Sequence, residues 1–263
     1  MRAGPLIRVI LVALLLAAAA TAVAIFVPWL PDQASEEAGR TDFVFWFVTA
    51  ICIGIFAIVA AISVYSFVKF RVRPDDDSDG PPVHGHTGIE IVWTVVPLIL
   101  VVAMLVVSSV ALARNDRVPA DHLRVEVLGQ QFAWVFAYPE EGMEVGKHKL
   151  ACIDRETRLI ADRCKTSPNL RLPVGRSTRL YLTAREVIHS FFVPEFRLKQ
   201  DAVPGMTTAI TITPTKRGDY PVICTELCGL GHALMRSRAI VTSAAEFERW
   251  RRSPSGENGD TSP

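Results

Sequence analysis

Two long runs without charged residues are the feature that most restricts how this chain folds. Residues 43–67 contain no charge over 25 positions, and residues 91–113 contain none over 23. Because about 20 apolar residues cross a hydrocarbon core, both runs are predicted to be transmembrane helices. The segment between them is polar and carries Lys69, Arg71 and Arg73, which the positive-inside rule assigns to the cytoplasm. Residues 41–113 are therefore predicted to form a two-helix hairpin with the rest of the chain outside.

A third apolar run lies near the N-terminus. Residues 9–27 follow Arg2 and Arg8 and are rich in leucine and alanine. A basic start, a short apolar core and small residues are typical of a secretory signal peptide, which we expect within residues 1–30. The alternative is a retained N-terminal helix. Either reading leaves the hairpin with the same orientation.

The pattern changes after the second membrane run. Residues 122–128, 179–183, 206–213 and 236–241 alternate with period two between glycines and prolines, as in an antiparallel sandwich or barrel. We therefore predict an extracytoplasmic all-β domain over residues 114–252. Ser243 with Glu246 forms a capping-box pattern before a short helix. Residues 253–263 are rich in Gly, Ser, Pro and acidic residues and are expected to be disordered.

A group of soft metal ligands lies late in the chain. Cys224, Cys228, His232 and Met235 occupy twelve residues, and His189 lies 35 residues upstream of the first of them. Thiolate and thioether sulfurs select copper or an iron–sulfur centre, and imidazole suits copper and zinc. A blue mononuclear copper site needs one cysteine; a second thiolate is accounted for if two cysteines bridge two coppers. A structural zinc site and a disulfide between Cys224 and Cys228 are the alternatives.

The chain resembles a known family in four segments. These are Glu90–Pro97, the segments beginning at His189 and Leu198, and the run from Cys224 to Met235. All are similar to subunit II of haem–copper cytochrome c oxidase. The resemblance extends over roughly residues 41–242 and implies a cupredoxin-like Greek-key β-barrel. It also implies a binuclear copper centre, CuA, and a complex with oxidase subunit I and the other oxidase subunits.

The resemblance assigns roles to individual residues. It implies that Cys224 and Cys228 bridge two copper ions and that His189, His232, Met235 and the backbone carbonyl of Glu226 complete the ligand set. It further implies that the Glu226 carboxylate reaches a magnesium ion at the subunit I interface, a solvated loop glutamate being the alternative. Glu90 corresponds to the mouth of a proton path into subunit I. An acid at a helix start is also favoured by the helix dipole, so a structural role is the alternative there.

One segment departs from the family pattern. The family's electron-entry surface has two tryptophans, of which Phe132 replaces the first and Trp134 matches the second. Residues 114–263 contain 22 Lys and Arg against 18 Asp and Glu, so an acidic docking face for a basic cytochrome c is not evident. A C-x-x-C-H haem attachment motif is also absent from the sequence, and we expect no covalent haem. We expect a cytochrome c donor that is tethered to the membrane or held in a supercomplex.

Two further cysteines indicate the compartment. Cys152 and Cys164 lie in the stretch 147–168, which looks like an insertion relative to the family. Outside the membrane, two cysteines in one polar loop are most simply explained as a disulfide, with two free thiols as the alternative. Cys52 lies inside a predicted membrane helix and is expected to pack there.

These features predict the electron-entry subunit of a proton-pumping terminal oxidase in a bacterial plasma membrane. It would take electrons from cytochrome c and pass them to haem in subunit I, where oxygen is reduced to water. A copper delivery or storage protein and a quinol-oxidase-like subunit II are the alternatives. The net charge of +1 gives no reason to expect nucleic acid as a partner.

Overall fold

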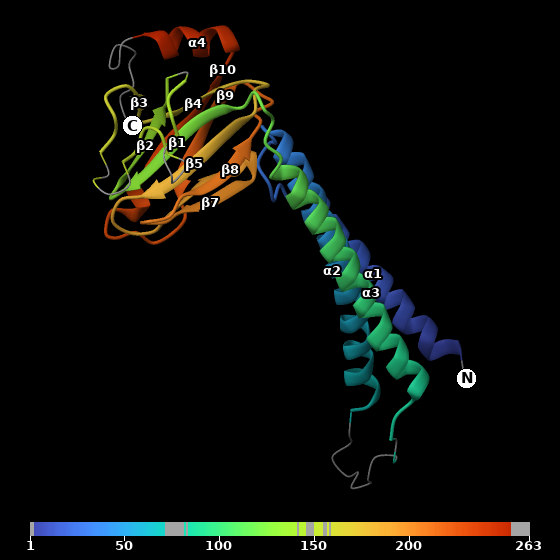
Figure 1. Cartoon of the computed structure of the whole chain (residues 1–263). Coiled ribbons are helices and arrows are strands. Elements are labelled where there is room, and N and C mark those ends of the chain that lie inside the picture. The colour runs from blue at the N-terminus through green and yellow to red at the C-terminus, as the bar shows by residue number, and fades with distance from the viewer. Residues whose placement is uncertain are drawn as a thin grey trace. The chain divides into compact units, whose positions relative to one another are not determined.

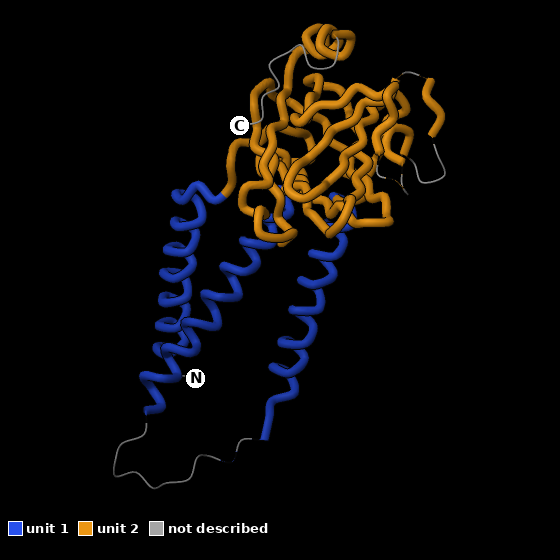
Figure 2. The backbone as a smooth tube through the Cα atoms, turned by 90° about the vertical axis from the view of Figure 1, so that its left-hand side faces the viewer, with its two compact units in different colours: residues 1–29, 42–111 blue, residues 30–41, 112–263 orange. Residues whose placement is uncertain are grey.

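The computed structural model describes residues 3–71, 82, 84–140, 142–145, 150–154, 157 and 159–253. These residues form two compact units (Figure 2). One contains residues 1–29 and 42–111, and the other contains residues 30–41 and 112–263. Most of the polar segment between the two membrane runs, residues 72–81 and 83, lies outside the described residues, as does the tail from residue 254.

The first unit is built from three long helices (Figure 1): α1 over Ala3–Phe26, α2 over Glu36–Lys69 and α3 over Thr87–Asn115. All three are long and apolar enough to cross a membrane. The two predicted spans are therefore helices, and the N-terminal apolar run is a third candidate span. Pro97 lies inside α3 without ending it. Such prolines are tolerated in membrane helices because neighbouring groups satisfy the freed backbone atoms.

The second unit contains two five-stranded sheets among its described residues. The first sheet has the order β3-β2-β1-β5-β8. Its strands, in chain order, are Leu123–Gln130, Ala133–Tyr138, Lys165–Ser167, Thr178–Ala184 and Thr208–Ile212. The second sheet has the order β4-β10-β9-β6-β7. Its strands are Leu170–Pro173, His189–Val193, Leu198–Ala202, Gly218–Cys224 and Arg236–Thr242.

The expected alternating strands are present, but their pairing is not purely antiparallel. β1 lies parallel to β5, and β4 lies parallel to β10. Each parallel pair joins strands that are not consecutive in the chain, so a crossover connection separates them. Alternation of side chains predicts which face a residue occupies but not which neighbour its strand takes. The parallel pairs could therefore not be predicted from the strand pattern.

A single large hydrophobic cluster draws on both sheets. β1 and β5 contribute residues such as Val125 and Leu180, and β4 and β9 contribute Leu172 and Val222. The aromatic ring of Phe191 contacts those of Trp134 and Phe136 edge to face at centroid distances of 5.6 and 6.2 Å. Burying a large apolar side chain contributes roughly 1.5–3 kcal/mol. This core therefore fixes the β6 strand, which begins with His189.

A short helix and a preceding segment complete the β unit. Helix α4, Ala244–Arg252, begins at a capping box in which Ser243 and Glu246 exchange hydrogen bonds, as predicted. The segment before α2 hydrogen-bonds to two connections between strands of the same unit. The Ala34 N–H donates to the Glu195 carbonyl at 3.0 Å, and the Thr215 N–H donates to the Ala34 carbonyl at 2.8 Å. Residues 30–41, which include the first residues of α2, therefore belong to the β unit.

The predicted insertion forms a second, smaller cluster on the β unit. Cys152 and Cys164 are joined by a disulfide bond. They pack with Leu128, Ala137 and Leu150 in a cluster separate from the main core. The buried carboxylate of Glu126 accepts hydrogen bonds from the backbone N–H groups of residues 151, 152 and 153. One strand residue thus holds the start of the disulfide-closed loop against the sheet.

Candidate metal centre

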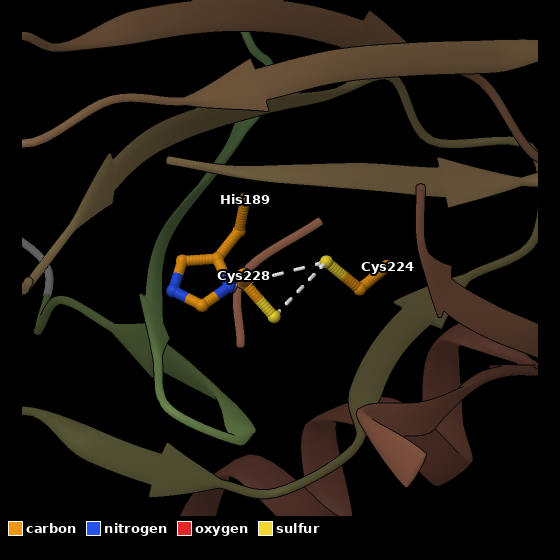
Figure 3. Close-up of side chains that lie close together, drawn as sticks. All are labelled: His189, Cys224 and Cys228. Atoms are coloured by element: carbon orange, nitrogen blue, oxygen red, sulfur yellow. Dashed lines mark hydrogen bonds between the residues drawn. The ribbon is translucent and has the colours of Figure 1, made fainter. Parts of the chain in front are cut away.

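Two adjacent strands and one loop bring the candidate ligands together (Figure 3). β6 begins at His189 and β9 ends at Cys224, and the two strands pair antiparallel with Phe191 opposite Cys224. The chain then turns through a loop, residues 225–235, that includes a short 3-10 helix over His232–Leu234. The loop returns to the sheet at β10. Ligands that are 35 residues apart in sequence therefore meet at one end of the sandwich.

The distances define a compact sulfur and nitrogen cluster. The Sγ atoms of Cys224 and Cys228 lie 4.0 Å apart. The Nδ1 atom of His189 lies 3.9 Å from Cys224 Sγ, and that of His232 lies 3.6 Å from Cys228 Sγ. The Met235 thioether lies 3.8 Å from Cys228 Sγ. Ligand atoms of His189, Cys224 and Cys228 all lie within 4.8 Å of one another.

Glu226 contributes differently from its neighbours. Its backbone carbonyl oxygen lies 3.3 Å from Cys224 Sγ, so the carbonyl belongs to the cluster. Its side chain is exposed, whereas His189, Cys224, Cys228 and Met235 are buried. The backbone carbonyl of Glu226 therefore faces the sulfur cluster, whereas its carboxylate is exposed at the surface.

Burial sets the protonation of the cluster. Burial and the neighbouring Cys224 raise the pKa of the Cys228 thiol to about 11. Burial also lowers the pKa of His189, with a smaller lowering from His232 and an opposing influence of Glu186. In the metal-free protein the Cys228 thiol is thus protonated at neutral pH and His189 is neutral. A metal ion that binds thiolate must displace protons, since a thiolate and not a thiol is the ligand.

The aromatic residues predicted for electron entry differ in position. Trp134 is 2% exposed, and its ring contacts the rings of His189 and Phe191 edge to face. Phe132 is 39% exposed and lies over the ligand loop. A Cβ atom on Gly231 would sit 2.4 Å from a Phe132 ring carbon, so only glycine leaves room for this contact. Phe132 is therefore the aromatic at the surface, and Trp134 is a core residue behind His189.

Glu90 and the disulfide of Cys152 and Cys164, which the sequence also singled out, are not part of the ligand cluster. Glu90 is in the first turn of α3, where its carboxylate accepts a hydrogen bond from the His86 N–H at 3.0 Å. This contact satisfies a free backbone donor at the helix start. The disulfide of Cys152 and Cys164 belongs to the smaller cluster on the other sheet.

Sequence reasoning missed the role of Gln131. Its side-chain amide donates a 2.5 Å hydrogen bond to the carbonyl of Cys228, although the two residues are 97 positions apart. Its backbone N–H also donates to the Glu186 carboxylate at 3.3 Å. A glutamine next to an aromatic residue carries no motif that predicts such a contact. Its proximity to Phe132 is the only signal in the sequence.

Comparison with known proteins agrees with this geometry. Residues 123–244 match the family model described as cytochrome c oxidase subunit II, periplasmic domain. Residues 20–112 match the model for the transmembrane domain of the same subunit. The cytochrome c oxidase subunit 2 of Thermostichus vulcanus is 32% identical over 85% of this chain and 77% of its own length. That of Synechocystis is 30% identical over 84% of this chain and 74% of its own length.

The chain belongs to the cytochrome c oxidase subunit II family. As a subunit II, it is a membrane component of a haem–copper terminal oxidase, and its His, Cys and Met cluster is the CuA-type site at which electrons enter. Its β unit is of the periplasmic type. A crystal structure of the periplasmic domain of subunit II from Bradyrhizobium japonicum is similar, with 30% identity and a TM-score of 0.39, over 51% of this chain and 94% of that one.

Proposed function

We propose that the cluster of this subunit II binds two copper ions, with Cys224 and Cys228 each bridging both. The donor set supports this reading because it contains one thiolate more than a mononuclear blue copper site uses. Both thiols are unpaired and buried, and their sulfurs are 4.0 Å apart without being bonded. His189 and His232 each face a different cysteine sulfur through Nδ1, as two separate ions would require.

The remaining ligands complete the two coordination shells. We assign His189 and the Glu226 carbonyl to the side of Cys224, and His232 and Met235 to the side of Cys228, according to their distances. Copper held by Cys224 and Cys228 would supply one-electron transfer, and sharing the electron between two ions would keep the change of geometry small. The protein's own contribution is rigidity and exclusion of water. His189 and Met235 have no measurable exposure, and His189 is held within the aromatic core.

Phe132 is the proposed contact through which electrons reach this cluster. Its ring is exposed to a donor on one side and lies against Gly231 of the ligand loop on the other. Trp134 is buried and therefore suits a role in packing His189 rather than in first contact with a donor. This distinction refines the pair of aromatic residues expected from the sequence.

The donor is proposed to be a cytochrome c that does not rely on an acidic docking face. The loop surface beside Phe132 is apolar, with exposed leucines at positions 227, 230 and 234. The charged groups near the ligands in sequence carry both signs, since Glu186 and Glu226 are acidic and Arg185 and Arg236 are basic. Long-range steering requires an excess of one charge. A donor tethered to the membrane or held in a supercomplex would not need it.

Two acidic residues have proposed roles toward subunit I. The exposed Glu226 carboxylate suits magnesium, a hard ion that takes one or two protein carboxylates. Glu90 is proposed to lie at the entrance of a proton path. Its hydrogen bond to the His86 backbone gives a structural reason for an acid at the same position. Loss of proton uptake in Glu90→Gln with an intact helix would separate the two roles.

The proposed placement is a bacterial plasma membrane, with the two sheets outside as a cupredoxin-like Greek-key barrel. Lys69 and Arg71 at the end of α2 favour a cytoplasmic position for that end. We propose that α1 is a signal peptide removed within residues 1–30, which would leave the hairpin over 41–113 and the copper domain over 114–252. The hydrogen bonds of Ala34 to the β unit favour cleavage before that residue.

The electron-entry role is tested with His232→Asn in the assembled oxidase. Reduced cytochrome c should no longer reduce the haems of subunit I, while dithionite should still reduce them. Cys52→Ser is the matched control, since Cys52 belongs to α2 of the other unit and is not one of the candidate ligands. Normal electron entry in His232→Asn would favour a copper delivery or storage role. Efficient oxidation of quinol without cytochrome c would favour a quinol-oxidase-like subunit.

A further inference from the structure

The turn between β1 and β2 connects the two segments that carry the ligands. On one side, the Gln131 N–H donates to the Glu186 carboxylate, and the Arg185 guanidinium donates to the side-chain oxygen of Gln130 at 3.0 Å. Residues 185 and 186 belong to the connection that leads into His189. On the other side, the Gln131 amide donates to the Cys228 carbonyl at 2.5 Å. The turn thus spans from the His189 segment to the Cys228 loop.

The ligand loop is shaped to receive the Gln131 side chain. Gly229 has a φ of +132°, and a Cβ atom there would lie 2.8 Å from Gln131 Nε2. A side chain on residue 229 would therefore be strained and would displace the amide. The neighbouring Phe132 ring lies in the same way on Gly231. Two consecutive turn residues each rest on a glycine of the loop, with Cys228 directly before the first glycine.

From these contacts we infer that Gln131 is a positioning residue for the CuA-type site. Its amide holds the Cys228 backbone, and so the Cys228 sulfur, in place for the metal. The inference rests on the proposed copper site. The hydrogen bond from Gln131 to the Cys228 carbonyl, called the clamp below, belongs to the chain itself. Outer partners of metal ligands commonly change metal affinity by about 10- to 100-fold when they are removed. The hydrogen bond that the Cys228 carbonyl accepts also withdraws electron density from this ligand residue, which favours the reduced state of the metal site.

The test compares Gln131→Met with Gln130→Met in the full chain. Methionine keeps the length of glutamine but cannot donate a hydrogen bond. Gln130 is the matched control because its side chain bonds to Arg185 and not to the ligand loop. In Gln131→Met we expect copper transfer to a chelator to be favoured about 10- to 100-fold relative to wild type. We also expect a lower reduction potential. Gln131→Lys, which restores a donor of similar reach, should recover the retention of copper.

A second measurement on the copper-free chain is independent of the metal. The N–H groups of His232, Leu234 and Met235 are hydrogen-bonded within the loop. Their hydrogen exchange should be about fivefold faster in Gln131→Met, the effect of losing one ordinary hydrogen bond, while exchange in β1 and β5 stays unchanged. Wild-type exchange together with wild-type copper retention in Gln131→Met would overturn the inference. If wild type fails to bind two coppers while exchange still rises in the variant, the copper proposal fails and the clamp stands.

Discussion

The sulfur atoms of Cys224, at the end of β9, and Cys228, in the loop that follows, lie 4.0 Å apart, both buried and unbonded. A disulfide would bring them to about 2.05 Å. Cys152 and Cys164 of the same unit are bonded, so the unit contains one paired and one unpaired set of cysteines. In an oxidising compartment, paired thiols are the expected state. The unpaired thiols of Cys224 and Cys228 therefore indicate a metal site. The imidazole and thioether groups beside them indicate that the metal is copper.

Cys228→Ser should abolish the shared electronic state of the two metals. A hydroxyl oxygen is a hard donor and does not replace a soft bridging thiolate. Copper-loaded Cys228→Ser should lose the mixed-valence signal in electron paramagnetic resonance (EPR) and bind fewer than two coppers. Cys52→Ser should behave as wild type. A mixed-valence spectrum that survives in Cys228→Ser would show that this cysteine is not a bridge.

Removing the disulfide should affect stability but not the copper spectrum. Cys152→Ser with Cys164→Ser should lower the free energy of unfolding by about 3 kcal/mol, because the closed loop restricts the unfolded chain. Denaturant unfolding measures the loss. The copper absorption spectrum should remain, since the disulfide belongs to a separate hydrophobic cluster. Alkylation of both cysteines in unreduced wild-type protein would show that they are not paired.

Electron entry from a soluble basic cytochrome c should be slow and nearly independent of salt. Steered association is fast at low ionic strength and falls as salt screens the charges. The ligand loop beside Phe132 presents exposed leucines rather than a cluster of carboxylates. Stopped-flow oxidation across an ionic-strength series measures this dependence. Phe132→Leu should slow entry further at every salt concentration.

A fast rate at low salt that falls steeply as salt rises would reveal an acidic docking face. Glu140 and Glu144, with Glu141 outside the described residues, are the carboxylates that such a face would use. An unchanged rate in Phe132→Leu would remove Phe132 as the entry aromatic and leave Trp134 to be tested.

The capping box of α4 should give the β unit an acid-sensitive contribution to stability. Hydrogen bonds from the Ser243 hydroxyl and backbone, with a smaller effect of Arg217, hold the pKa of Glu246 below its ordinary value. A carboxyl group with a lowered folded pKa stabilises above its unfolded pKa, and this contribution is lost as pH falls through the folded value. The stability difference between wild type and Glu246→Gln should therefore shrink as pH falls below about 4.5. A stability difference that stays constant as pH falls would contradict this role of Glu246.

Ser243→Ala removes the other half of the same box. The Ser243 hydroxyl accepts from the Glu246 N–H, while the Glu246 carboxylate accepts from the Ser243 N–H. Loss of such a cap costs about 1 kcal/mol. Thermal unfolding of the copper-loaded chain measures it. An unchanged midpoint would mean that packing of Phe247 and Trp250 alone holds the helix.

Local chemistry explains what the sequence could predict. The membrane helices, the α4 cap and the ligands of the 224–235 loop all depend on residues close together in the chain. His189 could be named as a candidate ligand, but its place beside Cys224 could not be predicted, because that place depends on the pairing of β6 with β9. The third candidate span, α1, lies on the apolar run that composition predicted to be a signal peptide or a retained helix.

Long-range contacts account for what was missed. The parallel pairs β1–β5 and β4–β10 follow from crossover connections that alternation does not encode. The bond from Gln131 to Cys228 joins residues 97 positions apart and depends on two glycines that leave room for it. The burial that separates Trp134 from Phe132 depends on how the aromatic core packs. Such contacts require the folded structure.

The copper content and EPR spectrum of the full chain test the central claim most directly. The detergent-solubilised protein, loaded with copper and freed of excess metal, should hold two coppers per chain by elemental analysis. Its EPR spectrum should show one unpaired electron shared equally between both nuclei. One copper per chain with an ordinary four-line signal would contradict a binuclear site bridged by Cys224 and Cys228.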